Sequence, residues 1–539
     1  MKRTVWQGLA ASGGKALGRV YRQRVRGREV DASLGHSADE RERFYRALKE
    51  AKAELLALSE EAREAVGEAE SEIFFIHTLF LEDEDFLNAA DRALLATHTA
   101  EYALTVARDY GIAALLATGD GVMMARCDDL RDVTERVMRK LTNEDEADFG
   151  GEPFLYLADD ITPSEVLSLM KTECVGIALT GGALQSHAAI LAAAASLPML
   201  VKVKGLAAEG GALGLLDADA GIFVQPPSEE DIGAFMRYRE EQSEREKRLA
   251  RFRDMRFSYP SGRALTVSAN VGSLFECERA LMLGAEGIGL FRSELLFIES
   301  EREPSEEEQF SVYRQLVESV SPHTAVLRVL DVGADKIPRW LSLDDEPNPA
   351  LGLRGIRLFD KYAALFERQL RAMLRASAYG KLVILLPMVT SVDEIRRVKA
   401  VLQRLSGELS ARGERVGAWR LGVMIETPAA ALDCRALAEE VDYFSIGSND
   451  LFQYTMAVDR ENPQALAAVD ARPQALFRLI DEVIAAAHEK GVTVSVCGAL
   501  AGDPEVAEFL LDREIDALSL SLSAILPVKE ICFKKLKSL

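Results

Sequence analysis

The apolar residues of the first 140 positions recur at helical spacing. Between Ala38 and Leu141 the chain is rich in Ala, Leu, Glu and Arg, and Phe44, Leu48 and Leu55 follow a period close to 3.6. This period places apolar side chains on one face of a helix. The pattern therefore predicts a bundle of helices.

The pattern changes at Phe154, where short apolar runs begin to alternate with helix-like segments. The runs are FLYLADD (154–160), VGIALTGG (175–182) and PMLVKV (198–203). Such alternation is typical of α/β layers, and we expect the segment up to Tyr21 to join the same sheet. From Ser228 to Arg256 charges of both signs are dense and apolar residues sparse, which predicts a solvated connecting helix.

Beyond Tyr259, eight apolar runs recur at intervals that leave room for a helix. The runs are LTVSANVG (265–272), GIGLFRSE (287–294), AVLRVLDVG (325–333), KLVILLPMV (381–389), RLGVMIET (420–427), YFSIGSND (443–450), TVSVCGAL (493–500) and DALSLSLS (516–523). Eight such strands with helices between them predict a (β/α)8 barrel. The expected fold is multidomain α/β: an α/β domain with an inserted helical bundle, then a C-terminal TIM barrel.

Composition narrows the class of protein. The 539 residues include 64 Lys and Arg against 86 Asp and Glu, so the net charge of −22 argues against a nucleic-acid or anionic-membrane binder. The most apolar stretch, 176–203, is interrupted by glycines and polar residues, and the N-terminus has no signal-peptide core, so we expect a cytoplasmic protein without membrane insertion. The 6 cysteines are scattered without a CxxC pair, which indicates neither disulfides nor a zinc site.

Polar side chains close most of the predicted barrel strands. Active sites of such barrels lie at the C-terminal strand ends. The candidate residues at these ends and in the adjoining loops are Arg292, Arg328, Lys336, Arg354, Glu426, Asn449, Asp450, Arg460 and Cys497. Arginines match carboxylate and phosphate oxygens, and neighbouring carboxylates suit Mg²⁺ shared with a phosphate. The set predicts a site for a small phosphorylated acid, although each charge taken alone fits a rim salt bridge. Cys497 is either a packed small hydrophobe or, beside a substrate, a general acid.

A second candidate centre is His187. It follows Gly181 and Gly182 and begins a predicted helix, 188–195, for which Ser186 is placed as N-cap. A phosphate on His187 would face the positive end of the helix dipole, and neutral imidazole is a competent nucleophile. A structural histidine is the alternative at this point.

Several motifs together resemble phosphoenolpyruvate-protein phosphotransferase, Enzyme I of the bacterial sugar phosphotransferase system. The strongest is DYFSIGSNDLFQYTMAVDR (442–460). Other similar segments are GLFRSE (289–294), LRVLDVGADK (327–336), EPNPALGLRGIR (346–357), LGVMIETPAA (421–430), VCGALAGDP (496–504), AASGGKALGRV (10–20), IFFIHTLFLEDEDF (73–86) and DDLRDVTERVMRKL (128–141). The resemblance covers nearly the whole chain.

The resemblance implies transfer of a phosphoryl group from phosphoenolpyruvate to His187 and then to the small phosphocarrier protein HPr, with release of pyruvate. It implies that Arg292, Arg328, Arg354, Arg460, Asn449, Asp450 and Lys336 hold the substrate, that Glu426 and Asp450 bind Mg²⁺, and that Cys497 protonates the departing enolate. It also implies a homodimer.

The same resemblance divides the chain into four parts. Residues 1–30 with 142–227 form the phosphohistidine domain, 31–141 the helical HPr-binding domain, 228–258 a linker helix, and 259–539 the phosphoenolpyruvate-binding and dimerisation barrel. The acidity of the chain leads us to expect an acidic docking face for HPr on the helical domain.

One segment departs from the family pattern. The family loop reads G-G-R-T-S-H, whereas this chain has Ala183, Leu184 and Gln185 before Ser186 and His187, and Ala193 replaces a second family arginine. A regulatory paralogue with weak transfer is therefore one alternative. A relative of phosphoenolpyruvate synthase or pyruvate phosphate dikinase is another, but it would need a nucleotide-binding domain for which the chain shows neither room nor a Walker-type loop.

Overall fold

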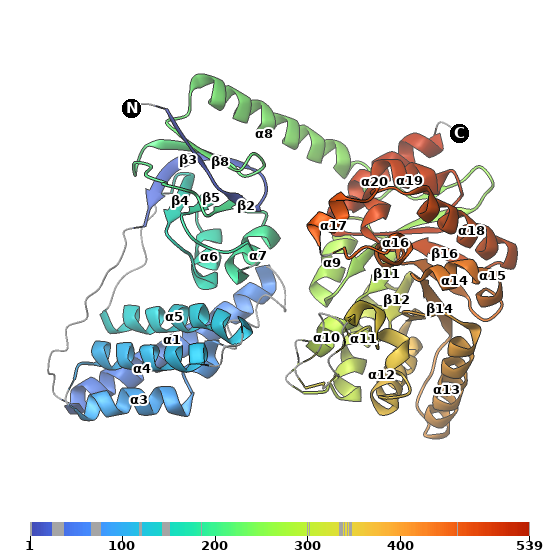
Figure 1. Cartoon of the computed structure of the whole chain (residues 1–539), viewed down its shortest axis with the longest axis horizontal. Coiled ribbons are helices and arrows are strands. Elements are labelled where there is room, and N and C mark those ends of the chain that lie inside the picture. The colour runs from blue at the N-terminus through green and yellow to red at the C-terminus, as the bar shows by residue number, and fades with distance from the viewer. Residues whose placement is uncertain are drawn as a thin grey trace. The chain divides into compact units, whose positions relative to one another are not determined.

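The chain forms two compact units, Met1–Ser243 and Glu244–Leu539. The computed structural model describes residues 3–23, 37–65, 77–96, 98–117, 121–142 and 151–537, except for 185, 299, 301, 334–337, 339, 342, 344, 345, 347 and 461. Figure 1 shows both units, each of which is described on its own.

The first unit contains the predicted helical bundle. Its helices are α1 (Ser37–Ala65), α3 (Glu84–Leu95), α4 (Ala100–Ala117) and α5 (Gly121–Thr142). Phe44, Leu48 and Leu55 are buried in the bundle core, as their helical spacing predicts. Asp83 caps α3 by accepting the backbone N–H of Phe86 at 2.8 Å.

The same unit contains a mixed sheet of eight strands in the order β1-β8-β7-β3-β4-β5-β6-β2. The strands are β1 (Thr4–Gln7), β2 (Leu9–Ser12), β3 (Lys15–Arg22), β4 (Phe154–Ala158), β5 (Cys174–Leu179), β6 (Met199–Val201), β7 (Leu213–Asp217) and β8 (Ile222–Gln225), with helices α6 (Pro163–Met170) and α7 (His187–Ala194). β3 pairs in parallel with β4 and antiparallel with β7, so the N-terminal segment joins this sheet as predicted.

The charged connecting segment forms helix α8 (Glu229–Ala250). The helix ends earlier than the predicted segment, because residues 251–254 form turns and Phe257–Ser258 form the short strand β9, which pairs with β10 (Ala264–Val271). The boundary between the two units falls within α8.

The second unit is a closed barrel of eight parallel strands, which confirms the predicted fold class. After β10 the strands are β11 (Gly287–Phe291), β12 (Thr324–Arg328), β13 (Lys381–Leu386), β14 (Trp419–Ile425), β15 (Tyr443–Ile446), β16 (Thr493–Val496) and β17 (Ala517–Leu520). Neighbours pair in this order, and β10 pairs with both β11 and β17, which closes the barrel.

Helices follow most of the strands along the chain (Figure 1). They are α9 (Leu274–Met282), α10 (Glu294–Ile298), α11 (Glu306–Val320), α12 (Ala363–Ala376), α13 (Val392–Ala411), α14 (Pro428–Leu432), α15 (Cys434–Leu437), α16 (Ser448–Met456), α17 (Pro463–Ala467), α18 (Gln474–Lys490), α19 (Pro504–Leu511) and α20 (Leu522–Lys537), with short 3-10 turns η1 (Pro349–Leu351), η2 (Gly355–Leu358), η3 (Ser377–Tyr379) and η4 (Ala499–Gly502).

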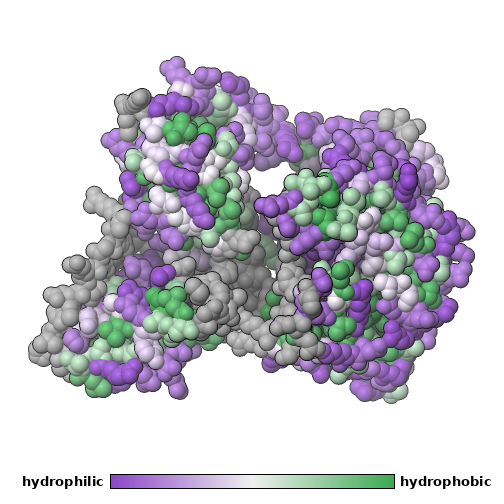
Figure 2. Space-filling view, in the orientation of Figure 1, coloured by the Kyte–Doolittle hydropathy of each residue, from purple (hydrophilic) through white to green (hydrophobic). Residues whose placement is uncertain are grey.

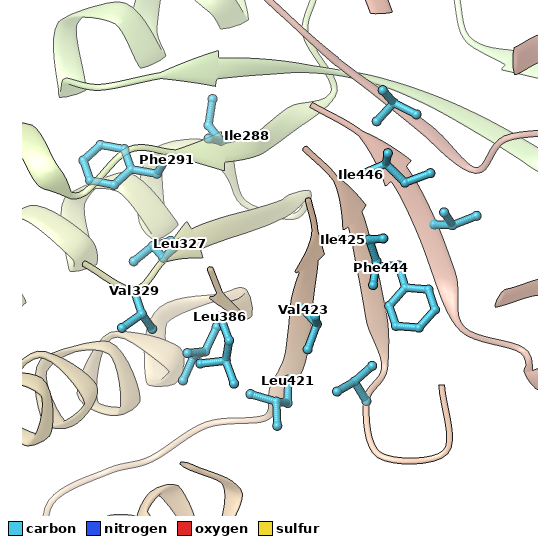
Figure 3. Close-up of a cluster of buried hydrophobic side chains, with 14 of the residues drawn as sticks. Ile288, Phe291, Leu327, Val329, Leu386, Leu421, Val423, Ile425, Phe444 and Ile446 are labelled. Atoms are coloured by element: carbon cyan, nitrogen blue, oxygen red, sulfur yellow. The ribbon is translucent and has the colours of Figure 1, made fainter. Parts of the chain in front are cut away.

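Successive side chains of a strand point to opposite faces, and the barrel uses both faces. One set, which includes Phe291, Leu327 and Val423, belongs to the large core shared with the helices (Figure 3). The alternate set forms a smaller cluster with Cys497, the residue after β16; its strand members are Leu290, Val326, Val383, Leu385, Met424 and Tyr443. The barrel interior is therefore packed up to the level of Cys497.

No helix in the described part of the chain is long and apolar enough to cross a membrane. The face shown in Figure 2 is dominated by hydrophilic residues, with hydrophobic residues in small groups.

A buried lysine holds the segment after α8 against the barrel. Lys529 is 1% exposed, and its Nζ donates to the carbonyl oxygens of Arg253 at 2.6 Å, Met255 at 3.1 Å and Gly284 at 2.5 Å. Burial lowers the pKa of this ammonium group. All three of its donors are used, which compensates for the loss of hydration.

We expect Lys529→Met to lower the free energy of unfolding of the barrel by about 3 kcal/mol, because it leaves buried carbonyl groups without a donor. Chemical denaturation followed by circular dichroism measures this change. Lys534→Met is the matched control on the same helix, since Lys534 is exposed and forms a surface ion pair with Glu530. Equal stability of the two variants would contradict the anchoring role.

Candidate active site

A buried network of arginines and carboxylates lies at the C-terminal ends of the barrel strands. Arg354 donates to both carboxylate oxygens of Asp331, at 2.8 and 3.2 Å, and to Asp450 Oδ1 at 3.2 Å. Arg328, the last residue of β12, donates from Nε to Glu294 Oε1 at 3.0 Å and lies 3.3 Å from Asp331 Oδ2. The network therefore connects the ends of β11, β12 and β15.

The charges of the network alternate in sign. Burial opposes the charge of Arg328, but Glu294 and Asp331 outweigh it and hold the pKa of Arg328 above its usual value. Asp331 and Asp450 raise the pKa of the buried Arg354 in the same way. Both guanidinium groups therefore stay charged. Arg328 and Arg354 are thus paired with Glu294, Asp331 and Asp450 as in a salt-bridge network, but these side chains are at most 15% exposed and do not form an exposed rim.

Glu426, directly after β14, is fully buried at the centre of these charges. Its Oε1 accepts the backbone N–H of Met388 at 2.6 Å, and its Oε2 has no hydrogen-bond partner among the residues that the structure describes. Burial, together with the negative charges of Asp331 and Asp450, raises the pKa of Glu426 to about 8, although Arg328 and Arg354 act in the opposite direction. An unsatisfied buried carboxylate oxygen is costly and marks a place where a cation or a substrate group fits.

The backbone that supports Glu426 is in an unusual conformation. Met388, a non-glycine residue, has φ 58°, in the left-handed region. This region costs a non-glycine residue about 1–2 kcal/mol of conformational free energy, and such strain concentrates at functional sites. The strain aims the N–H of Met388 at the carboxylate.

The donor set fits Mg²⁺ shared with a substrate. Within the residues that the structure describes, no group of three or more His, Cys, Asp or Glu side chains is arranged to hold a metal ion. Mg²⁺ is commonly bound by only one or two carboxylates together with substrate oxygens and water. Glu426, with its unpartnered oxygen, and the nearby Asp450 match that requirement.

Cys497 lies directly after β16 at the top of the interior cluster and is 7% exposed. Its Sγ accepts a hydrogen bond from the Ser445 hydroxyl at 2.9 Å. Burial raises the pKa of the Cys497 thiol to about 11, so the group keeps its proton at neutral pH. A protonated thiol at this position can act as an acid.

Three further candidates, Arg292, Asn449 and Arg460, come after the C-terminal ends of β11 and β15. Arg460 donates to Asp450 Oδ2 at 3.1 Å, and the exposed Asn449 accepts the backbone N–H of Ala499 at 3.1 Å. Arg292 follows β11 and is exposed. Lys336 falls outside the described residues.

His187 belongs to the first unit, where it is the first residue of α7. Ser186 caps this helix by accepting the backbone N–H of Ala189 at 3.2 Å, as predicted. The structure describes the backbone of His187 but not its side chain. Of the described residues next to it in sequence, Leu184 and Ile190 are both 46% exposed, whereas Ala188 and Ala189 are buried.

Sequence reasoning assigned no role to Met388, Tyr454 and Ser445. Tyr454 accepts from Arg354 at 3.2 Å and donates to the carbonyl oxygen of Ala350. Tyr454 and Ser445 lie inside the 442–460 motif, so the motif could have indicated both residues. Nothing in the sequence indicates the positive φ of Met388.

The fold and the site together define a phosphoenolpyruvate-utilising enzyme. Residues 246–536 match the family model "PEP-utilising enzyme, PEP-binding domain", residues 7–126 match the N-terminal domain of such enzymes, and residues 152–221 match their mobile domain.

Relatives that match along nearly the whole chain show which family of phosphoenolpyruvate-utilising enzymes it belongs to. The chain is 36% identical to the phosphoenolpyruvate-protein phosphotransferase of Bacillus sp. (strain S) over 531 residues, covering 97% of this chain and 92% of that protein, and the Geobacillus stearothermophilus protein of the same name matches to the same extent. The Haemophilus influenzae phosphotransferase is 35% identical over 541 residues, covering 97% of this chain and 93% of that protein. The chain belongs to the phosphoenolpyruvate-protein phosphotransferase family, which confirms the resemblance inferred from its motifs.

Proposed function

We propose that this enzyme transfers the phosphoryl group of phosphoenolpyruvate to His187 and from there to an HPr-like carrier protein, releasing pyruvate. One observation carries the proposal: the barrel mouth holds a buried network of arginines around the carboxylate of Glu426, one oxygen of which has no partner in the described part of the chain. The membership of the chain in the phosphotransferase family supports it.

The arginines account for substrate binding. Phosphoenolpyruvate carries a phosphate and a carboxylate, and guanidinium groups meet both in bidentate geometry. Arg292, Arg328, Arg354 and Arg460 would hold the substrate together with Asn449 and Asp450. Carboxylates hold Arg328, Arg354 and Arg460 in place before substrate arrives, which reduces the cost of ordering them. Lys336 is proposed for the same site from its motif alone.

Glu426 and Asp450 would hold Mg²⁺. When bound, the ion would neutralise charge on the phosphoryl and enolate oxygens. The thiol of Cys497 would give its proton to C3 of the enolate to form pyruvate.

Magnesium binding to the metal-free protein should strengthen as the pH rises from about 6 to about 8. The carboxyl of Glu426 must lose its proton to bind the ion, and burial raises its pKa to about 8, so binding at neutral pH releases a proton. Calorimetry in two buffers of different ionisation enthalpy measures that release. Affinity that is constant over this range would contradict the role of Glu426.

His187 would be the nucleophile that carries the phosphoryl group. The backbone N–H groups of the first turn of α7 and the helix dipole favour a phosphate at this end. The transfer requires the α/β domain to approach the barrel, and the exposed, charged helix α8 is proposed as the hinge.

The proposed division of the chain is that derived from its motifs: phosphohistidine domain 1–30 and 142–227, helical HPr-binding domain 31–141, linker 228–258, and barrel 259–539. Separate family-model matches to a mobile domain at 152–221 and a phosphoenolpyruvate-binding domain at 246–536 support the separation of the phosphohistidine domain from the barrel. A homodimer formed through the barrel, a cytoplasmic location and an acidic carrier-docking face on the helical domain complete the proposal.

The test is phosphoryl transfer by the full chain. Incubation with labelled phosphoenolpyruvate and Mg²⁺ should give acid-labile label on the protein together with an equivalent amount of pyruvate, and addition of an HPr-like protein should remove the label. Wild-type protein that takes up no label would overturn the function. Labelling by ATP in place of phosphoenolpyruvate would instead indicate a dikinase.

The apolar loop before His187 favours a second candidate, a regulatory protein that binds phosphoenolpyruvate but transfers slowly. Leu184 occupies a position where the family pattern has an arginine, so a cation that would steady the phosphohistidine is missing. Calorimetric binding of phosphoenolpyruvate with pyruvate release at background level would favour this candidate. If the loop is the cause, Leu184→Arg should raise the rate.

A further inference from the structure

A serine inside the barrel makes a contact with Cys497 that packing does not explain. Ser445 lies on β15 and is fully buried. Its hydroxyl donates to Cys497 Sγ at 2.9 Å, across 52 positions of sequence. Pairing of Ser445 with Ser495 and of Ile446 with Val496 sets this contact, because Cys497 directly follows β16.

The sulfur of Cys497 is a weak hydrogen-bond acceptor for the Ser445 hydroxyl while the thiol is neutral. The surrounding interior cluster is apolar, including Leu290, Met424 and Tyr443. Burial of a hydroxyl costs free energy unless a good acceptor is present, and a neutral thiol sulfur is a weak acceptor. An alanine could be buried at this position at a lower cost in free energy. The hydrogen bond is therefore expected to stabilise the protein mainly in another protonation state of the sulfur.

That state is the thiolate. A hydrogen bond to a charged acceptor is about twice as strong as one between neutral groups. The second contact of Sγ, to the carbonyl oxygen of Ile446 at 3.7 Å, is one in which the sulfur donates. Among the described residues, only Ser445 donates toward the sulfur, so its contact is the one that strengthens when the thiol proton leaves.

We propose that Ser445 is a positioning residue for proton transfer: its hydroxyl orients the Cys497 thiol and stabilises the thiolate left after protonation of the enolate. This inference rests on the proposed role of Cys497. In the step, the S–H bond breaks and a C–H bond forms at C3 of the enolate, using the enolate electron pair. The sulfur keeps its bonding pair as thiolate, accepts the Ser445 O–H, and is reprotonated from solvent.

The test measures the same proton transfer in reverse, as exchange of the C3 protons of pyruvate in D2O by NMR, with the full chain and Mg²⁺. Ser445→Ala should slow exchange about tenfold or more, since a hydrogen bond to a charged group is lost, while the KM for pyruvate stays constant. The pH at which exchange reaches half its maximum should move upward. Ser445→Thr, which keeps the hydroxyl, should recover most of the rate.

Ser495 supplies the matched control. It is also fully buried, one strand away in register, but its hydroxyl donates to the carbonyl oxygen of Phe444 at 3.3 Å. Ser495→Ala should leave the exchange rate and its pH profile near those of the wild type. A second readout is the pH dependence of Cys497 alkylation by iodoacetamide, followed by peptide mass spectrometry, whose midpoint should rise only in Ser445→Ala.

The inference would be overturned if Ser445→Ala exchanged the C3 protons at the wild-type rate and kept the wild-type alkylation profile. It would also be overturned if Ser445→Ala and Ser495→Ala lowered the exchange rate equally. Failure of the proposed function has a different signature. If Cys497→Ala retains exchange, Cys497 is not the acid, whatever Ser445 does. If Cys497→Ala abolishes exchange and Ser445→Ala does not slow it, only the positioning role is lost.

Discussion

Replacement of His187 by alanine is expected to abolish acid-labile labelling by phosphoenolpyruvate and to reduce pyruvate release to background. No other group can take over, because the nucleophile forms the covalent bond to the transferred phosphoryl group. Loss of such a group typically removes several orders of magnitude of rate. Labelled phosphoenolpyruvate with Mg²⁺, followed by acid and base stability of the label, measures the effect.

The structure provides controls for this variant. His323 lies just before β12, at the N-terminal ends of the barrel strands and thus away from the mouth. His323→Ala should therefore retain full labelling. His187→Ala should also keep the barrel intact, so it should still bind phosphoenolpyruvate in calorimetry. Label that persists in His187→Ala would show that another residue carries the phosphoryl group and would contradict the proposed role of His187.

The second large effect concerns Glu426. We expect Glu426→Gln to lower the rate of pyruvate formation by about a thousandfold and to abolish saturation by Mg²⁺, because the amide removes the negative charge with almost no change of shape. Initial rates across a Mg²⁺ titration measure both changes. Asp516→Asn is the control: Asp516 precedes β17 at the far end of the barrel, where it accepts from Arg263 at 2.8 Å and from the backbone of Val494. It should keep the wild-type Mg²⁺ dependence.

Stability separates this loss of function from misfolding. The pKa of Glu426 is raised to about 8 in the folded protein by burial, whereas the carboxyl in the unfolded chain has its ordinary pKa of about 4.5. Between these values the folded state keeps a proton that the unfolded state has released, so the wild type loses stability as the pH rises from about 4.5 through about 8. In EDTA at about pH 8, Glu426→Gln should therefore melt at a higher temperature than the wild type. A less stable variant would indicate that the carboxylate holds the fold rather than a metal.

Much of this protein can be predicted from local patterns. Each of the predicted barrel strands, such as GIGLFRSE and YFSIGSND, overlaps an observed strand, because a fully buried parallel strand must be a short continuous apolar run. The residues that follow these runs, including Glu426 and Cys497, lie where the strand-end rule places them. The N-cap role of Ser186 was equally predictable, since it depends on groups only three residues apart.

The sequence by itself therefore determined the barrel, the sheet that its N-terminal segment joins, and the residue types available at the mouth. Only the tertiary structure decided how those residues pair: Arg354 with Asp331 and Asp450, 23 and 96 positions away, Met388 with Glu426, and Ser445 with Cys497. The physical reason is range. Strand formation and capping depend on neighbours along the chain, whereas these contacts exist only after the barrel closes and sets its register, and the pKa values of Glu426 and Cys497 depend on the burial that closure creates.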